Sequence, residues 1–281
     1  MIIRLIQPAE FPGLIDFIVP LCRHPQTQCI NSWAGDDKAT LLQDFKKMDA
    51  DNELLYLGAF NDGRMVGTLG CEFDEDLGRG WLHGPHLVIT NEVSDAIDLY
   101  IHLLNQLPES INQLDAYPNL ANAFLHRFYT QMGFKERLAP SNNYNLSRNA
   151  FIPNPDSLVI RELTGNLSGS FIHLYESTFP GSPYSAQRLI SSANGQFKIY
   201  LTTMDDSVTG FVVASHSTDH SHGKIEFLGV DQHFCRRGIG TALLNRGLRW
   251  LFADQNTQSV SLSVFSNLDG ARRLYENQGF T

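Results

Sequence analysis

The chain has 281 residues, of which 42% are hydrophobic, 18% charged and 11% aromatic, and this is typical of a globular protein with one large or two ordinary domains. The formal net charge of −9 comes without a basic stripe, so we expect no nucleic-acid or anionic-membrane partner. We expect a cytoplasmic protein, because the chain has no signal peptide, no run of roughly 18 apolar residues that could span a membrane, and only four scattered cysteines.

The first half alternates strand and helix patterns. A strand is predicted at 2–6, followed by helical material that prolines and glycines interrupt. Two strands at 54–60 and 65–73 meet at the tight turn Asn61-Asp62-Gly63. A strand near 80–88, a helix at 93–107, a strand at 111–116 and a short helix carrying Tyr129 follow.

The second half repeats this order. Strands are predicted at 156–163, 197–203, 208–215, 224–230 and 259–265, with helices at 241–253 and around Tyr275. Two Pro and two Asn residues make 149–155 the predicted linker between domains 1–148 and 156–281. The pattern indicates an α/β fold in which each domain has a central mixed, mostly antiparallel sheet flanked by helices.

Residues 122–134 and 267–280 end the two halves with nearly the same phrase. Each contains an Asn able to cap a helix, a short amphipathic helix with a Tyr, and Gly-Phe four residues after that Tyr. This agreement predicts one fold used twice.

The residues that can carry chemistry concentrate between Glu226 and Thr241. A predicted strand enters a loop with Gly238 and Gly240, and this loop opens an amphipathic helix. Glycines let backbone N–H groups converge, and a helix N-terminus adds unsatisfied donors, so the loop suits a pyrophosphate. The alternative is a tight turn that only lets helix and strand pack.

The segment Phe234-Cys-Arg-Arg-Gly-Ile-Gly-Thr-Ala-Leu-Leu resembles the acetyl-CoA pyrophosphate loop of the GNAT superfamily of N-acetyltransferases, Gln/Arg-x-x-Gly-x-Gly/Ala. Residues 267–280 resemble the later motif of that family, Asn…Ala…Leu-Tyr…Gly-Phe. The chain is therefore identified as a tandem, two-domain member of the superfamily. Cys235 departs from the pattern; the backbone N–H is what this position contributes, and Arg236 can supply the cation.

The resemblance implies acetyl-CoA as the co-substrate and no metal. In the family the fourth and fifth strands diverge, and the pantetheine arm lies between them. Tyr275 resembles the general acid that protonates the departing thiolate. The implied cofactor-binding residues are Leu228, Gly229, Val230, Cys235, Arg236, Arg237, Gly238, Ile239, Gly240, Thr241 and Asn267.

Glu226 is the candidate general base, because it precedes Leu228 by two residues and should share its face of the strand. The alternative is an edge Glu paired with a neighbouring Lys, and His233 is a second candidate base. His216, His220 and His222 lie in a polar segment between strands, so we expect a solvated hairpin and no metal site.

The first half lacks a Gly-x-Gly loop and carries Glu92 and Asp95 where the second half has two arginines. It resembles a GNAT domain whose cofactor loop has decayed, and we expect it to support the second domain and help to form the acceptor cleft. The second half stops at Thr281, whereas residues 135–147 are expected to continue the first half into a final strand.

The predicted function is acetyl transfer from acetyl-CoA to a primary amine, by direct attack in a ternary complex. We expect the acceptor amine to belong to a small molecule or to a peptide. The alternative is a non-catalytic CoA-binding or interaction module that keeps the fold.

Overall fold

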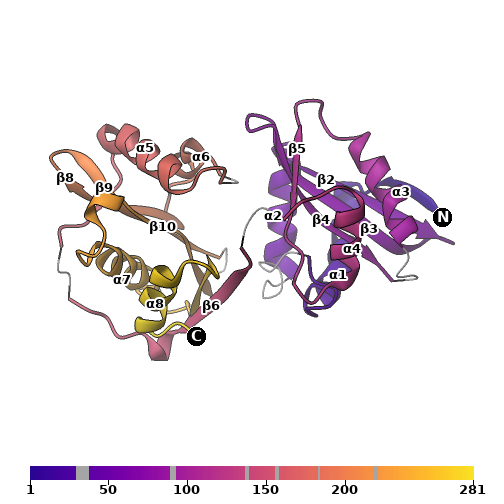
Figure 1. Ribbon diagram of the computed structural model, residues 1–281. Coiled ribbons are helices and arrows are strands. Elements are labelled where there is room, and N and C mark those ends of the chain that lie inside the picture. The colour runs from indigo at the N-terminus through magenta and orange to yellow at the C-terminus, as the bar shows by residue number, and fades with distance from the viewer. Residues whose placement is uncertain (30–37, 89–92, 137–138, 156–157, 183, 218–220) are drawn as a thin grey trace. The chain divides into compact units, whose positions relative to one another are not determined.

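The computed structural model describes residues 1–29, 38–88, 93–136, 139–155, 158–182, 184–217 and 221–281. The chain divides into two compact units, Met1–Arg137 and Leu138–Thr281. In each unit helices pack on both faces of one sheet (Figure 1). Within the described ranges, no helix is both long enough and apolar enough to cross a membrane.

The first unit has the strand order β1-β2-β3-β4-β5, antiparallel except for the parallel β4–β5 pair. Helices α1 and α2 pack on one face around Phe11 and Phe45, and α3 and α4 pack on the other around Leu99 and Phe128. The strands are β1 (Ile2–Leu5), β2 (Leu54–Asn61), β3 (Arg64–Asp74), β4 (Arg79–Leu87) and β5 (Gln113–Ala116), and the helices are η1 (Pro8–Glu10), α1 (Phe11–Cys22), α2 (Lys38–Ala50), α3 (Val93–Leu104) and α4 (Ala123–Gln131).

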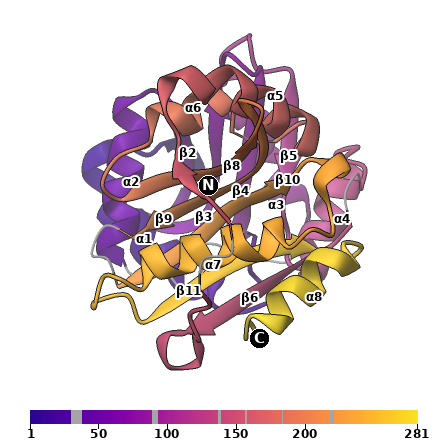
Figure 2. The same ribbon diagram turned by 90° about the vertical axis from the view of Figure 1, so that its left-hand side faces the viewer.

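The second unit has the strand order β6-β11-β10-β9-β8-β7, with β10 and β11 parallel. Helices α5 and α6 cover β8 and β9 on one face, and α7 and α8 cover the other face (Figure 2). The strands are β6 (Ser141–Ser147), β7 (Arg161–Glu162), β8 (Phe197–Met204), β9 (Ser207–His216), β10 (His222–Val230) and β11 (Ser259–Phe265), and the helices are η3 (Arg148–Ala150), η4 (Gly165–Leu167), α5 (Ser168–Thr178), α6 (Ala186–Ser191), η5 (Gln232–Phe234), α7 (Ile239–Leu251) and α8 (Asp269–Asn277).

In each unit a two-residue hairpin loop joins two neighbouring antiparallel strands. The two-residue loop Asp62-Gly63 joins β2 to β3, and Asp205-Asp206 joins β8 to β9. All four residues have positive φ, between 48° and 76°. Two left-handed residues in a row match the twist of an antiparallel pair, which is why Asp and Gly stand there.

The repeated phrase also folds in the same way in both units. Gly133 and Gly279 have φ of 83° and 89° and end α4 and α8. The N–H of Phe134 donates to the Tyr129 carbonyl at 2.9 Å, and that of Phe280 donates to the Tyr275 carbonyl at 3.1 Å. This glycine-dependent helix ending confirms the prediction of one α/β fold used twice.

The boundary between the units lies earlier in the chain than the predicted linker at 149–155. Residues 141–147, expected to complete the first sheet, form β6 and pair antiparallel with β11 in the second. The side chains of Tyr144 and Leu146 explain this, because both are buried in the core beneath α7 and α8. Residues 149–155 are also anchored there, since the Asn245 side chain bonds both the N–H and the carbonyl of Asn154.

The predicted strand at 156–163 is reduced to β7, Arg161–Glu162, and residues 156 and 157 lie outside the described ranges. The burial pattern accounts for the short strand: Arg161 and Glu162 are both exposed, so β7 buries no apolar side chain of its own against the sheet.

Replacing Leu146 with alanine should lower the free energy of unfolding of the second unit by about 2–5 kcal/mol, because this side chain is fully buried. Asn142→Ala, at an exposed position on the same strand, is the control and should change stability by less than about 0.5 kcal/mol. Hydrogen exchange in Leu146→Ala should accelerate in α7 and β11. Acceleration confined to β4 and β5 would show instead that residues 141–147 belong to the first sheet.

Candidate functional site

The strands β10 and β11 pair over a short stretch and then separate. Their register covers only His222–Lys224 opposite Ser259–Ser261. Beyond this point β10 continues to Val230 paired with β9, while β11 continues to Phe265 paired with β6. The edge of β10 that carries Leu228, Gly229 and Val230 therefore has no strand partner within the described residues. The predicted divergence of these two strands is present.

A β-bulge in β10 sets the direction of the side chains beside this gap. Ile225 lies opposite Ala214 and Phe227 opposite Val213, so Glu226 is the additional residue. Phe227 packs into the cluster under α5 and α6, whereas Leu228 packs into the cluster under α7 and α8.

Glu226 accepts a hydrogen bond from Ser215 on the α5–α6 side, so it faces away from Leu228. The prediction that Glu226 and Leu228 share a face was therefore wrong. One extra residue shifts the strict alternation of a strand by one position.

Glu226 is held by two neighbours. Its Oε1 accepts from Ser215 Oγ at 2.7 Å, and its Oε2 lies 2.9 Å from Lys224 Nζ. The side chain keeps 19% of its area exposed. The Lys–Glu pair considered as the alternative is thus present, and the carboxylate is oriented by partners on its own and the adjacent strand.

The loop from β10 into α7 turns its backbone donors outward. Arg236 and Gly238 have φ of 60° and 79°, and Gly238 is the N-cap of α7. Among the described residues, the N–H groups of Arg236, Arg237 and Gly238 have no acceptor. The first turn of α7, at Ile239, Gly240 and Thr241, adds donors that no helix can satisfy internally. This donor set fits an anion such as a pyrophosphate.

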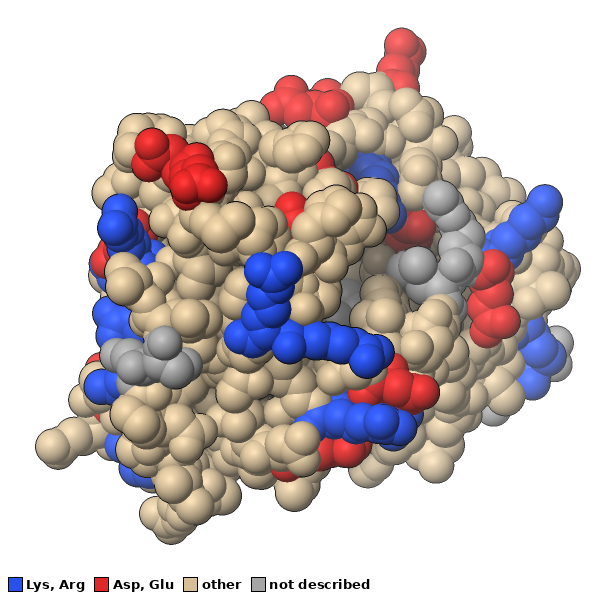
Figure 3. All heavy atoms as spheres, turned by 60° about the vertical axis from the view of Figure 1, so that its left-hand side comes forward, with Lys and Arg blue, Asp and Glu red and all other residues tan. Residues whose placement is uncertain are grey.

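The positively charged side chains of this loop are two arginines. Arg236 and Arg237 are both exposed, and the Arg237 guanidinium lies 5.2 Å from the Phe234 ring centroid. On the face seen in Figure 3, basic and acidic side chains lie interspersed among a larger area of uncharged residues. Within the loop, these two arginines and the backbone donors are the groups that attract an anion.

Gly240 also has a packing role. A Cβ at this position would lie 3.1 Å from Leu274 Cδ1 of α8 and 3.7 Å from Val230 Cγ2 of β10. The tight-turn alternative is therefore partly correct, because the absence of a side chain lets α8 approach the start of α7. The same contact brings the helix that carries Tyr275 beside the loop.

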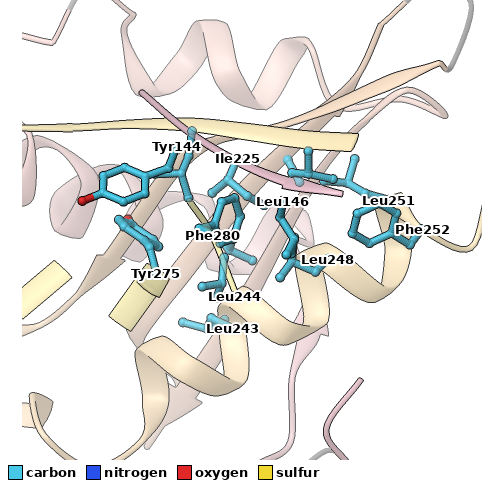
Figure 4. Packing of buried hydrophobic residues seen from close by; sticks show 14 of the residues in the cluster. Tyr144, Leu146, Ile225, Leu243, Leu244, Leu248, Leu251, Phe252, Tyr275 and Phe280 are labelled. Atoms are coloured by element: carbon cyan, nitrogen blue, oxygen red, sulfur yellow. The ribbon is translucent and has the colours of Figure 1, made fainter. Parts of the chain in front are cut away.

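Tyr275 is buried on α8, with 7% of its area exposed. Its ring packs beside Tyr144 of β6 and against Phe280 (Figure 4), with centroids 6.5 and 6.0 Å away. Burial raises the pKa of Tyr275 to about 12, so the hydroxyl keeps its proton at neutral pH. Within the described residues this hydroxyl has no hydrogen-bond partner.

Comparison with known proteins identifies the family to which these residues belong. Residues 167–280 match the profile of the acetyltransferase (GNAT) family. This half of the chain is a GNAT domain. A comparison with curated proteins finds no match.

Solved structures extend the similarity of fold to the whole chain. A GCN5-related N-acetyltransferase from Sphaerobacter thermophilus has a TM-score of 0.72 at 17% identity, covering 100% of this chain and 91% of that chain. A tandem GNAT protein from the clavulanic acid biosynthesis pathway has a TM-score of 0.63 at 12% identity, covering 99% and 94%. At such identities the similarity concerns the fold, which is two GNAT-like domains in tandem.

Asn267 of the GNAT domain differs from its predicted setting, whereas the role of the Cys235 backbone N–H stays a prediction. Cys235 is exposed, with Sγ turned back to within 3.5 Å of the Asp231 carbonyl. Asn267 is exposed in the turn before α8 and does not cap it, since Leu268 is the N-cap and has no side-chain bond. Its counterpart Asn122 does cap α4, where the side chain accepts from the Leu125 N–H. A turn within residues 265–268 delays the start of α8 by one residue.

The GNAT-like first unit fills its own strand gap. Beyond Leu82, β4 separates from β5, and Cys29 lies there with 0% exposure. Cys29 Sγ is 3.5 Å from the Leu82 carbonyl, 3.6 Å from the Gly84 carbonyl and 3.8 Å from the Tyr129 hydroxyl. Tyr129, the counterpart of Tyr275, donates to the Gly84 carbonyl. A thiol of the chain itself thus occupies the space beside this tyrosine.

The structure describes one of the two acidic residues that the first unit carries where the second half has arginines. Asp95 lies in the first turn of α3, whereas Glu92 lies outside the described residues. A small cavity of about 50 Å³ opens near the filled gap, lined in part by Thr27, Pro85 and His86. Burial lowers the pKa of His86 to about 4, so this wall of the cavity is neutral.

Two histidines of the GNAT domain, His216 and His222, contact hydroxyl groups. His222 lies between Ser259 and Ser261, with both ring nitrogens 2.9 Å from a hydroxyl oxygen. His216 packs edge-to-face against Trp250 and contacts Thr257. His220 lies outside the described residues, and His233 is exposed in η5. Among the described residues no group of three potential ligands is placed to hold a metal ion.

Sequence reasoning missed Tyr144 and Phe227. The alternation Asn-Tyr-Asn-Leu at 143–146 predicts a strand with Tyr144 on the buried side. Which sheet that strand joins is not readable from the alternation. Phe227 was missed because its direction depends on the bulge.

Proposed function

We propose that the GNAT domain transfers an acetyl group from acetyl-CoA to a primary amine by direct attack within a ternary complex. The observation that carries this proposal is one set of elements beside the place where β10 and β11 separate. Within the described part of the chain, the edge of β10 without a strand partner lies before a loop whose N–H donors have no acceptor, and the buried Tyr275, whose hydroxyl has no partner there, lies on the helix that packs against that loop.

The backbone is suited to hold the co-substrate. N–H groups from Arg236 to Thr241 would bind the pyrophosphate, with cationic support from the two arginines. The free edge at Leu228, Gly229 and Val230 would pair with the amides of the pantetheine arm. Asn267, which is exposed and follows β11 in the chain, would contact the same arm.

The side chains are suited to the proton transfers. When bound, acetyl-CoA supplies an activated thioester. As the amine nitrogen bonds to the carbonyl carbon and the carbon–sulfur bond breaks, Tyr275 would donate its proton to the sulfur. Glu226 would accept the proton that the amine loses, directly or through water, and a β10 N–H would stabilise the carbonyl oxygen.

The second candidate is a CoA-binding module without catalysis, and the Lys224–Glu226 pair favours it because the carboxylate is already engaged in an ion pair. Incubation with acetyl-CoA and a panel of primary amines, with detection of free thiol, separates the two. Amine-dependent thiol release supports the transferase. Tight CoA binding without release for any amine supports the module.

Titration calorimetry should find one CoA site per chain. In the described part of the first unit, Cys29 fills the gap beside β4. The control is a chain with Gly240→Asp, in which binding at the single site should weaken by at least about tenfold. Two equivalent sites in the wild-type protein, or unchanged affinity after this substitution, would contradict the assignment.

A further inference from the structure

Lys224 is the last residue of β10 that pairs with β11. It lies opposite Ser261 of β11 and Ser215 of β9. Beyond it the two strands separate, so Lys224 stands at the closed end of the gap between them. The next residue, Ile225, is buried in the cluster under α7 and α8. Because side chains alternate along a strand, Lys224 lies on the other face of the sheet, where Ser215 bonds Glu226.

The amine of Lys224 is close to a carboxylate and accessible from outside. Its Nζ lies 2.9 Å from Glu226 Oε2, and its side chain keeps 42% of its area exposed. The other carboxylate oxygen of Glu226 accepts a hydrogen bond from Ser215. A primary amine in contact with a group that can accept its proton is what the proposed reaction requires of an acceptor. Lys224 therefore offers this site an amine that belongs to the chain itself.

The proposed position of the co-substrate directs the thioester toward this amine. The loop at 236–241 follows the carboxyl end of β10, so a pyrophosphate bound there would lie beyond Val230. A pantetheine arm that pairs along the edge from Val230 to Leu228 would run back toward Glu226, and the gap closes at Lys224. The acyl group is the end of the co-substrate farthest along this arm. It would therefore lie toward the Lys224–Glu226 pair.

We propose that Lys224 is a site of self-acetylation, at which the chain transfers the acetyl group of bound acetyl-CoA to its own Nζ. The proposal rests on the acetyl-transfer function proposed above. Glu226 would accept one proton from the ammonium group, which frees the lone pair of the nitrogen. Nζ would then bond to the carbonyl carbon, the carbon–sulfur bond would break, and Tyr275 would protonate the sulfur. The second proton lost by the nitrogen replaces the one that Tyr275 gives, so the net products are an acetylated lysine, CoA and one proton.

Lys198 is the matched comparison for Lys224. These two are the lysines of the second unit in the sequence. Lys198 is also paired with a glutamate, since its Nζ lies 2.6 Å from Glu162 Oε1. It lies opposite Ala214, whose side chain is in the cluster under α7 and α8, so Lys198 is on the opposite face from Lys224. A large difference in acetylation between the two lysines would therefore not come from ion pairing alone.

Incubation of the whole chain with acetyl-CoA, without added amine, tests the proposal by peptide mass spectrometry. Lys224 should be acetylated at least about tenfold faster than Lys198, at a rate per chain that does not change with protein concentration. Equal rates at the two lysines overturn the proposal, and so does the absence of acetylation at Lys224. A rate per chain that rises with protein concentration shows transfer between chains and overturns self-acetylation.

Two variants of the proposed machinery separate catalysed from spontaneous acetylation. Gly240→Asp should slow acetylation of Lys224 by at least about tenfold when acetyl-CoA is below the wild-type Kd. Tyr275→Phe should slow it by about 10²- to 10⁴-fold. In both variants Lys198 should react as in the wild type. Acetylation of Lys224 at the wild-type rate in both variants would mean a spontaneous reaction and would overturn the proposal.

Two conservative lysine variants identify the residue that takes the acetyl group. Lys224→Arg keeps the positive charge and should abolish the single release of thiol per chain that accompanies self-acetylation. Lys198→Arg should leave this release unchanged. Normal CoA affinity shows that both variants are folded. Wild-type thiol release by folded Lys224→Arg, without added amine, would contradict the assignment.

Thiol release with added primary amines separates this inference from the transferase proposal. Release with an added amine, while Lys224 stays unmodified, overturns self-acetylation and leaves acetyl transfer standing. Acetylation of Lys224 that depends on Gly240 and Tyr275, without release for any added amine, supports self-acetylation and overturns transfer to a separate acceptor.

Discussion

Replacing Tyr275 with phenylalanine should lower kcat by about 10²- to 10⁴-fold, the usual contribution of a general acid or base. The ring that packs on Tyr144 and Phe280 remains, so the Kd for acetyl-CoA should change by less than about threefold. Burial raises the pKa of this tyrosine to about 12, and the protonated form is the active one. The wild-type rate should therefore show no loss from deprotonation of Tyr275 up to about pH 10.

Tyr129→Phe is the matched control, because it makes the same change in the repeated phrase of the first unit. Its hydroxyl bonds the Gly84 carbonyl and Cys29, so only a modest loss of stability is expected, with normal turnover. If Tyr275→Phe turned over at the wild-type rate, the acid would have to be water or another group. A loss of rate that tracked a loss of folded protein would point to packing alone.

Replacing Gly240 with aspartate should raise the Kd for CoA by at least about tenfold, or ~1.4 kcal/mol. The new carboxylate would stand at the second position of α7, among the N–H donors proposed to bind the pyrophosphate, and would repel it. The unliganded protein should stay folded. The added Cβ lies 3.1 Å from the flexible end of Leu274 and in ordinary contact with Val230, and an acidic residue in the first turn of a helix is favourable by about 0.3–1 kcal/mol.

Gly169→Asp provides the control. Gly169 occupies the second position of α5, with no heavy atom within 4 Å of an added Cβ. This variant adds the same charge at an equivalent helix position away from the loop, and its CoA affinity should match that of the wild type. Normal affinity in a folded Gly240→Asp protein would remove the loop from the site.

Local patterns predicted much of the fold correctly. The alternation Ser-Val-Ser-Leu-Ser-Val predicted the strand at 259–265, and β11 has these bounds. The helix after Gly238 and the ending at Gly279 followed from the conformations that glycine permits. These features depend on residues within a few positions of one another, so a sequence carries them directly.

The sequence did not predict which sheet the strand at 141–147 would join. Residues 141–147 alternate as a strand in any sheet, and nothing local distinguishes the edge of β5 from the edge of β11. The burial of Tyr144 and Leu146 under α7 and α8 decides between them, and those helices come about a hundred residues later in the chain.

The sequence by itself determined the tandem fold, the loop from Cys235 to Thr241 and the tyrosine phrase, because glycine geometry, helix ends and side-chain periodicity are local properties. Only the tertiary structure decided that β6 completes the second sheet, that Glu226 faces Ser215 rather than the side of Leu228, and that Cys29 fills the gap of the first unit. Each of these depends on contacts between distant segments or on a single inserted residue in a strand. Such contacts are selected by the packing of the whole unit, and the alternation of a short segment is compatible with either outcome.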